Sequence, residues 1–242
     1  MKTDIQQPRA YFVTGTDTEI GKTLVSCALV YAMAQRGWKS VGMKPVAAGT
    51  TQQNGVLCND DVEALKAASN FDWSNEALAL AAKAVNPYLF NLPVAPHIAA
   101  QKEEQEIKLD VILDSYHLLH DLADAIIVEG VGGFRVPLNA NVDSADMAQQ
   151  LGLPVIMVVG MRLGCINHAL LTAEVIAARG LHLAGWVANC AQKEMTFLQE
   201  NCQAIRERLN APLLGCIPYL EAPTLEKAAS YLDLTLLIKK MP

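Results

Sequence analysis

The residues from Gly15 to Thr23, GTDTEIGKT, have types and spacing suited to holding phosphate groups. They follow the apolar run 10–14 and open a segment of helical periodicity, so backbone N–H groups at a helix N-terminus can surround an anion. Lys22 could then reach the β- and γ-phosphates of a nucleotide, and the Thr23 hydroxyl could bind Mg²⁺. Five residues separate the two glycines, one more than in the standard P-loop pattern. The less specific alternative is a glycine-capped helix start with an incidental lysine.

A second group of residues, Glu129 to Gly133 (EGVGG), follows the apolar run 125–128. A carboxylate at the end of a buried strand beside a P-loop is suited to hold Mg²⁺, directly or through water. The glycines after it let the backbone approach a ligand closely. The alternative is a plain strand-to-turn transition, but Glu129 would then be an unpaired charge at a buried position. This pattern therefore favours a functional Glu129.

Two further charged positions follow in the same part of the chain. Lys44 ends the short apolar run 40–43 and precedes Pro45, so it can project a fixed cation; a solvated surface lysine is the alternative. Asn59, Asp60 and Asp61 begin a predicted helix. One side chain is enough to cap a helix N-terminus, so a carboxylate is left over that can face a metal.

Short apolar runs alternate with helical patterns along the chain, which indicates βαβ units. The runs are apolar throughout, as in parallel strands that are covered on both faces. We therefore predict one α/β domain over residues 1–242, of the P-loop NTPase type, with a mostly parallel sheet and helices on both faces. Every charged group above then falls at the carboxyl ends of strands, where ligands bind in such folds. Predicted strands are 10–14, 40–43, 125–128, 154–159, 183–188 and 212–217; predicted helices are 22–36, 59–68, 75–84, 109–122, 167–178, 194–209 and 231–240.

The composition excludes several classes of protein. Hydrophobic residues make up 52% of the 242 residues and charged residues 18%, so we expect a sizeable core and little disorder. The net charge of −6 argues against non-specific nucleic-acid binding, which needs a basic surface. No signal peptide or spanning helix is recognisable, and the six cysteines lack zinc or CxxC spacing. We expect a cytoplasmic protein with reduced thiols, whose partners are small molecules and neither nucleic acid nor membrane.

Five segments in order, GTDTEIGKT, KPVAAG, VEGVGG, GCINHALLTA and GWVAN, resemble the ATP-dependent dethiobiotin synthetase family over about residues 10–220. The longer phosphate loop is a feature of that family. The resemblance implies a ligase that uses ATP and Mg²⁺ to carboxylate 7,8-diaminononanoate with CO₂ and close the ureido ring of dethiobiotin, in biotin synthesis. It implies that a carbamate on one amine attacks the γ-phosphate, and that the second amine displaces phosphate from the mixed anhydride.

The resemblance also implies roles for single residues. Lys44 and Lys22 would be catalytic, Lys44 beside the carbamate and Lys22 on the phosphates. The metal ligands would be Thr23, Asp61 and Glu129. The nucleotide would be bound by Glu19, Ile20, Gly21, Lys22, Thr23, Leu24, Asp61, Glu129, Gly130, Val131, Gly132, Asn189, Cys190, Pro218, Tyr219 and Leu220, with Asn189 at the adenine edge. The diamine would be bound by Lys44, Ala48, Gly164, Cys165, Ile166 and Asn167.

The helix that begins at Gly164–Asn167 would hold the carboxylate of the substrate. In the family this helix comes from the partner subunit, so the resemblance implies a homodimer with shared sites. Its physical basis is the anion site that a helix N-terminus provides.

The chain also departs from the family pattern. Ala48 stands where a serine is frequent, and Thr50 is the position that could compensate. Cys190 stands where an aspartate can occur, and the acidic residue expected after Pro218 is Glu221 or Glu226. A diverged paralogue that acts on another amine or acid is therefore an alternative. A P-loop switch ATPase is another, although such proteins carry an extra early lysine that the segment 16–20 lacks.

Overall fold

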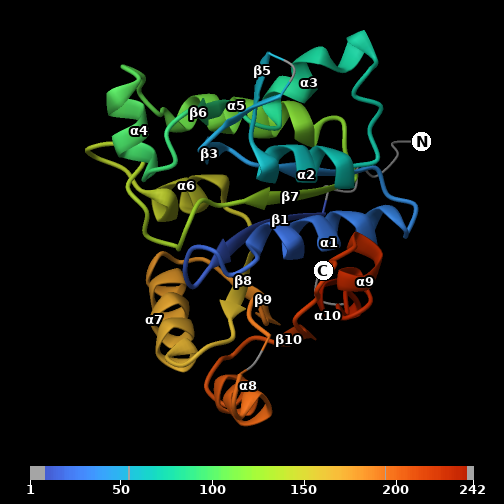
Figure 1. Ribbon diagram of the computed structural model, residues 1–242, viewed down its shortest axis with the longest axis vertical. Helices are drawn as coiled ribbons and strands as arrows, with labels where there is room; N and C mark the ends of the chain where they lie inside the picture. Colours follow the sequence, from blue (N-terminus) through green and yellow to red (C-terminus); the bar gives the residue numbers. More distant parts are fainter. Residues whose placement is uncertain (1–8, 54, 194, 239–242) are drawn as a thin grey trace, which may run out of the picture.

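The computed structural model describes residues 9–53, 55–193 and 195–238. Its centre is a six-stranded sheet with the order β10-β9-β8-β1-β7-β2, in which all neighbours run parallel (Figure 1). Because the strands are parallel, their carboxyl ends share one edge. The strands are β1 (Arg9–Gly15), β2 (Ser40–Met43), β7 (Ala125–Glu129), β8 (Val155–Gly160), β9 (Leu183–Asn189) and β10 (Leu213–Ile217).

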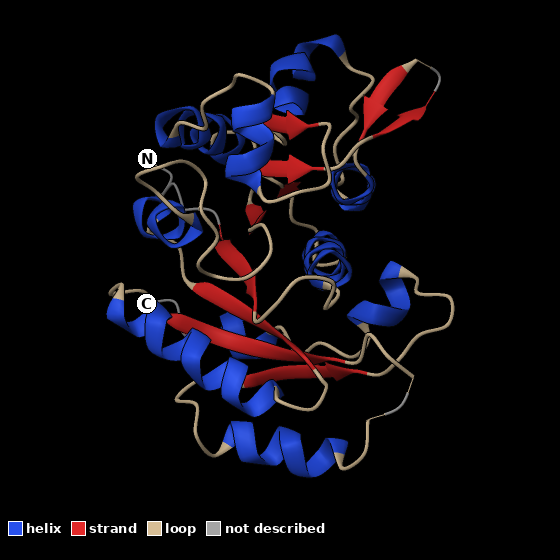
Figure 2. Ribbon diagram, turned by 60° about the vertical axis from the view of Figure 1, so that its left-hand side comes forward, coloured by secondary structure: helices blue, strands red, loops and turns tan. Residues whose placement is uncertain are grey.

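Helices cover both faces of this sheet (Figure 2). Alternate residues of a strand point to opposite faces, so Tyr11 and Val13 pack in one cluster and Phe12 in another. The first cluster joins α1 (Lys22–Ala34), α9 (Leu225–Ala229) and α10 (Thr235–Ile238) to the sheet. The opposite face is covered by α5 (Leu109–His120), α6 (Ser144–Leu151), α7 (Cys165–Ala178) and α8 (Leu198–Arg206). This arrangement confirms the predicted α/β class with a parallel sheet and helices on both faces.

A smaller layer lies beyond the β2 edge, in the upper part of Figure 1. Its centre is a parallel pair, β3 (Val46–Ala48) with β6 (Tyr88–Phe90), and next to it stands an antiparallel pair, β4 (Thr51–Gln53) with β5 (Val56–Cys58). The predictions did not include these three-residue strands, because so short a run shows no period. The 3₁₀ turn η1 (Glu76–Leu78) and the helices α3 (Ala79–Ala84) and α4 (Pro96–Lys102) belong to this part, whereas α2 (Asp60–Ala68) packs against α1 and the β2 edge of the main sheet.

The helix predicted over 231–240 is wrong for the described residues. The backbone of Leu232 forms a bridge with Gly215, and the Asp233 N–H donates to the Leu214 carbonyl at 2.7 Å. The edge strand β10 therefore holds this segment in extended form, and only Thr235–Ile238 is helical. Residues 239 and 240 lie outside the described residues. Leu234 and Leu237 are buried in the core, so the segment docks on the body of the protein.

Several predicted elements have different ends. The helix predicted at 194–209 is Leu198–Arg206, and residue 194 lies outside the described part of the chain. The helix predicted at 167–178 begins earlier, at Cys165. None of the helices in the described ranges has the length and apolar character needed to cross a membrane.

Candidate active site

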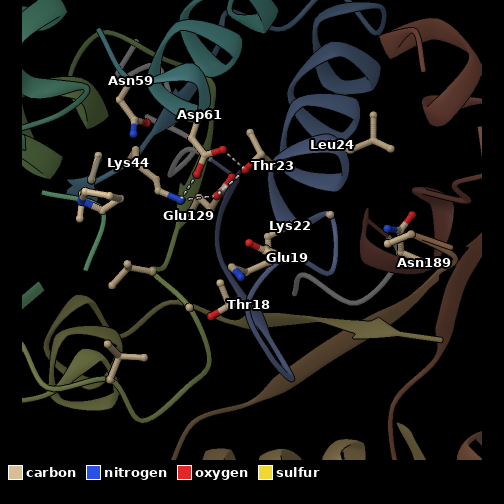
Figure 3. Close-up of a pocket in the computed structure, with 18 of the residues that line it drawn as sticks. Thr18, Glu19, Lys22, Thr23, Leu24, Lys44, Asn59, Asp61, Glu129 and Asn189 are labelled. Carbon is tan, nitrogen blue, oxygen red and sulfur yellow. Dashed lines mark hydrogen bonds and ion pairs between the residues drawn. The ribbon is translucent and has the colours of Figure 1, made fainter. Parts of the chain in front are cut away.

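A cavity of about 930 Å³ opens at the carboxyl ends of the strands (Figure 3). It lies over the end of β1, which has β7 on one side and β8 on the other, the position where open α/β sheets bind ligands. The loop after β1 and the residues that end β2, β7, β9 and β10 meet there. Of the predicted site residues, the lining contains Glu19, Gly21, Lys22, Thr23, Leu24, Lys44, Ala48, Asp61, Glu129, Val131, Gly132, Asn189, Cys190, Pro218, Tyr219 and Leu220.

The loop between β1 and α1 wraps around the Lys22 side chain. The Lys22 ammonium donates to the Asp17 carbonyl at 3.0 Å, and Gly21, at φ 82°, precedes the first turn of α1. No side chain of the described residues caps this helix, so its first N–H groups stay available to an anion. Burial, together with the positive charge of Lys44, lowers the pKa of Lys22 to about 8. A phosphate placed beside Lys22 would counter both effects.

Three oxygen-bearing side chains converge beside this loop from three different elements. The Thr23 hydroxyl lies 2.7 Å from Asp61 Oδ1 and 2.9 Å from Glu129 Oε1. Neighbouring ligands of an octahedral Mg²⁺, each about 2.0–2.1 Å from the ion, are about 2.9 Å apart. Glu129 Oε2 is buried and has no hydrogen-bond partner among the described residues. The donor set and its spacing therefore fit a divalent cation.

Lys44 completes this cluster. Its ammonium lies 2.8 Å from Asp61 Oδ2 and 2.5 Å from Glu129 Oε1, and the residue is only 4% exposed. Its backbone is fixed because the Lys44 N–H donates to the Val85 carbonyl and its own carbonyl accepts from Asn86 Nδ2. Burial alone would lower the pKa of Lys44, but the carboxylates of Glu129 and Asp61 outweigh it and raise that pKa.

The pKa of Asp61 is lowered, whereas that of Lys44 is raised. Burial alone would raise its pKa, but the Lys44 charge and the hydrogen bonds from Lys44 and Thr23 hold the pKa of Asp61 below its usual range. Asp60 makes none of these contacts, so of the two adjacent carboxylates it is Asp61 that joins the cluster (Figure 3). Asn59 caps α2 by accepting from the Val62 N–H, which settles the cap that the sequence left open.

Two predicted nucleotide-binding residues lie behind the cavity rather than on its surface. Ile20 is 3% exposed and packs into the hydrophobic cluster under α1, with Val13. Gly130 follows β7, and its N–H donates to the Val13 carbonyl at 2.9 Å. Both residues shape the walls from beneath.

The four residues at the start of α7 are not brought to the cavity of a single chain. Gly164, Cys165, Ile166 and Asn167 are absent from its described lining, and Cys165 is buried. Leu163, immediately before them, is 99% exposed. Their predicted role therefore depends on a second subunit.

Three residues whose roles the sequence left open also lie away from the cavity. The Thr50 hydroxyl donates to Asn91 Oδ1 at 3.1 Å and does not line the cavity. Glu221 and Glu226 are not among the described lining residues either. Ala48 does line the cavity. The Thr50 hydroxyl lies elsewhere, so it does not replace the serine hydroxyl that Ala48 lacks.

The cavity also contains residues that the sequence analysis did not assign to it. Asn59 could have been found, because it caps the helix that carries Asp61 and precedes Asp61 by only two residues. The proline-rich segment Pro93 to Pro96 could not be assigned to the cavity from its sequence, because it connects β6 to α4 outside the main sheet. The full set is Thr18, Ala47, Asn59, Pro93, Val94, Ala95, Pro96, Val136, Ala191 and Pro223.

Comparisons with known proteins agree with this architecture. A family model described as an AAA domain matches residues 9–227. The chain is similar to a ParA family ATPase from Chlorobium tepidum, with a TM-score of 0.55 and 13% identity over 96% of this chain and 94% of that one. It is also similar to the MinC:MinD cell division protein complex of Aquifex aeolicus, with a TM-score of 0.53 and 14% identity over 96% and 89% of the two chains. At such identities these likenesses show the P-loop α/β fold alone.

Two relatives are much more similar in sequence. One is the ATP-dependent dethiobiotin synthetase BioD of Aromatoleum aromaticum, 52% identical over 228 residues, which are 94% of this chain and 98% of the relative. The other is the ATP-dependent dethiobiotin synthetase BioD of a Janthinobacterium species, 50% identical over 230 residues, which are 93% and 94% of the two chains. Identity at this level over nearly the whole length shows that the chain belongs to the ATP-dependent dethiobiotin synthetase family.

Proposed function

We propose that this protein converts 7,8-diaminononanoate, CO₂ and ATP into dethiobiotin, ADP and phosphate, as a ligase of biotin biosynthesis. The observation that carries the proposal is the convergence of Lys22, Lys44 and the cluster of Thr23, Asp61 and Glu129 in one cavity. The chain around that cavity is about half identical to synthetases that are named for this product. The cavity volume of about 930 Å³ suits a nucleotide with a second small substrate.

The reaction needs stabilisation of negative charge more than it needs a base. A carbamate oxygen attacks the γ-phosphorus, the bond to the β–γ bridging oxygen breaks, and ADP leaves. Lys22 and Lys44 hold two fixed ammonium groups where charge develops on the transferring phosphoryl group. The second amine then attacks the carbamate carbon, the bond to the phosphate oxygen breaks, and the amine proton passes to phosphate or solvent as the ring closes.

An ATP-dependent P-loop enzyme uses a divalent metal, and we propose that it is Mg²⁺, held by Thr23, Asp61 and Glu129. The ion neutralises charge on the β- and γ-phosphate oxygens when bound. Mg²⁺ commonly takes one or two carboxylates and completes its shell with phosphate and water, which agrees with two carboxylates here.

We further propose a homodimer with shared sites. The diamine carries its carboxylate at the end of a long aliphatic chain, so that group needs an anion site away from Lys22 and Lys44. The N-terminus of α7 at Gly164–Asn167 is such a site, and in one chain it does not reach the cavity. The exposed side chains of Leu163 and Leu171 beside it support a surface that a second subunit covers. A cytoplasmic location, supported by six free cysteines, and the absence of nucleic-acid or membrane partners belong to the same proposal.

The test is release of phosphate from ATP with and without the diamine and bicarbonate, combined with mass spectrometry of the product. We expect phosphate release to require both substrates and to match dethiobiotin formation one to one. Turnover of ATP without the diamine would instead favour a switch ATPase. Turnover that needs a different amine or acid would favour a diverged paralogue.

A further inference from the structure

Asn189 connects two parts of the nucleotide site that are 169 residues apart in the sequence. It is the last residue of β9 and is 2% exposed. Its Nδ2 donates a hydrogen bond of 2.7 Å to the carbonyl of Ile20, in the loop after β1. Strand β8 separates β9 from β1 in the sheet, so this bond crosses the end of β8.

The residues around this bond leave space for it. Gly160 ends β8 and pairs with Asn189, and a Cβ at Gly160 would clash with the Ile20 side chain. Gly21 has φ 82°, which favours glycine, and a Cβ there would clash with Asn189 Nδ2. Ile20 is thus seated over the end of β8 with its carbonyl toward Asn189.

The bond has a consequence for the phosphate loop because the Ile20 carbonyl and the Gly21 N–H belong to one peptide unit. In a planar trans peptide these two groups point in opposite directions. Fixing the carbonyl toward Asn189 therefore fixes the Gly21 N–H away from it. If the plane of this peptide rotated by half a turn, the Gly21 N–H would point toward Asn189 and the Ile20 carbonyl oxygen would take its former direction. A carbonyl oxygen in that place repels phosphate.

We propose that Asn189 is a positioning residue for phosphate binding, in addition to the contact with the base that is proposed for it. The inference rests on the proposed nucleotide site. The side-chain amide nitrogen of Asn189 donates to the Ile20 carbonyl, whereas Asn189 Oδ1 is buried and has no partner among the described residues. The oxygen can thus accept a hydrogen bond from a base amine while the nitrogen holds the loop, so one side chain supports both ends of the nucleotide.

The test uses inorganic tripolyphosphate, a ligand that has phosphates and no base. Its affinity and that of ATP, each with Mg²⁺, are measured by calorimetry for wild type, Asn189→Ala and Asn189→Asp. We expect both variants to bind tripolyphosphate about tenfold more weakly, which corresponds to one hydrogen bond and the unpaired carbonyl left behind. Asn189→Asp should bind tripolyphosphate more weakly than Asn189→Ala, since its carboxylate repels the Ile20 carbonyl.

Tyr219→Ala is the matched control, because Tyr219 lines the same cavity as Asn189 but makes no hydrogen bond to the phosphate loop within the described part of the chain. We expect it to weaken ATP and to leave tripolyphosphate within about twofold of wild type. Wild-type affinity for tripolyphosphate in folded Asn189→Ala would overturn the inference, because Asn189 would then act on the base alone.

Circular dichroism establishes which variants are folded. Asn189→Ala buries no added charge, so it decides the question if Asn189→Asp does not fold. The measurement needs neither the diamine nor turnover, so a failure to make dethiobiotin leaves its outcome valid. A wild-type protein that binds neither ATP nor tripolyphosphate would contradict the nucleotide site itself and this inference with it.

Discussion

Lys44 and Glu129 form a buried ion pair at the floor of the cavity, with 2.5 Å between Lys44 Nζ and Glu129 Oε1. The pairing follows from the sheet, because β2 and β7 are parallel neighbours in which Met43 lies opposite Val128. Lys44 directly follows Met43, and Glu129 directly follows Val128, so the two side chains come side by side. Both partners are withdrawn from solvent, since Glu129 is 0% and Lys44 4% exposed. Removal of the Lys44 ammonium would therefore leave a buried carboxylate without its partner, which is strongly destabilising.

The first prediction concerns Lys44→Met. Turnover should fall about 10²–10³-fold, because one electrostatic donor is worth roughly 2.7–4 kcal/mol to a transition state. Stability should fall by about 3–5 kcal/mol, because a buried carboxylate loses its partner. Mg²⁺ should then raise the melting temperature of the variant more than that of wild type, since a divalent cation replaces the lost charge.

Calorimetry with and without Mg²⁺ measures these shifts. Lys66→Met is the control, because the only ion pair of the Lys66 ammonium with the described residues is the one with Glu63 at 3.7 Å, and the substitution keeps the Lys66 carbonyl that accepts from Trp73. Its stability should change by about 0.5 kcal/mol or less. Near-normal turnover in Lys44→Met would remove Lys44 from the catalytic residues.

The second prediction concerns Thr23→Val, which keeps the shape of the side chain and removes the hydroxyl. We expect folding to be intact and the Mg²⁺ concentration for half-maximal turnover to rise about tenfold, the effect of one lost contact to a charged group. Thr23→Ser, which retains the hydroxyl, should stay near wild type. If the Mg²⁺ titrations of the valine variant and wild type coincide, Thr23 is not a metal ligand.

The third prediction separates the cap of α2 from the cluster of Thr23, Asp61 and Glu129 next to it. Asn59 accepts from the Val62 N–H at 3.3 Å, and Asn59 Nδ2 donates to the Gly49 carbonyl at 2.7 Å. Asn59→Ala should cost about 1 kcal/mol of stability, as for other helix caps, and should also raise the Mg²⁺ requirement because it loosens Asp61. Both quantities are measured by urea unfolding and by Mg²⁺ titration of turnover.

Asn75→Ala is the matched control for this variant, because Asn75 caps η1 by accepting from the Ala77 N–H far from the cluster. It should lose stability with no change in the Mg²⁺ requirement. An equal change of that requirement in both variants would show that Asn59 has no specific effect on Asp61.

The fourth prediction tests the shared sites. Asn167→Ala should raise the KM for the diamine far more than the KM for ATP, because it affects binding of a remote group. Equal mixing with Lys44→Met subunits should restore about one quarter of wild-type activity, because half of the dimers are mixed and each has one intact site of two. Activity assays after mixing, together with sedimentation, measure this. A fully active monomer, or no rescue between two folded variants, would contradict the homodimer.

The sequence by itself determined the fold class, the family and the segments that meet in the cavity. Buried parallel strands are continuous apolar runs, which are local signals, and the carboxyl ends of parallel strands must share an edge. Gly21, Lys22, Lys44 and Glu129 each follow such a run, so their convergence could be expected before any contact was known. Their assignment to nucleotide, metal and catalysis stays a prediction until the variants are measured.

Only the tertiary structure decided the relationships between segments that are distant in the chain. The choice of Asp61 over Asp60 depends on how α2 is placed against β2 and β7, and the bond from Asn189 to Ile20 depends on the order of β9, β8 and β1. Pairing of Leu232 with the β10 edge likewise delayed the start of the helix predicted over 231–240 to Thr235. No local pattern contains these contacts, because their energies depend on strand order and on packing between elements far apart in sequence.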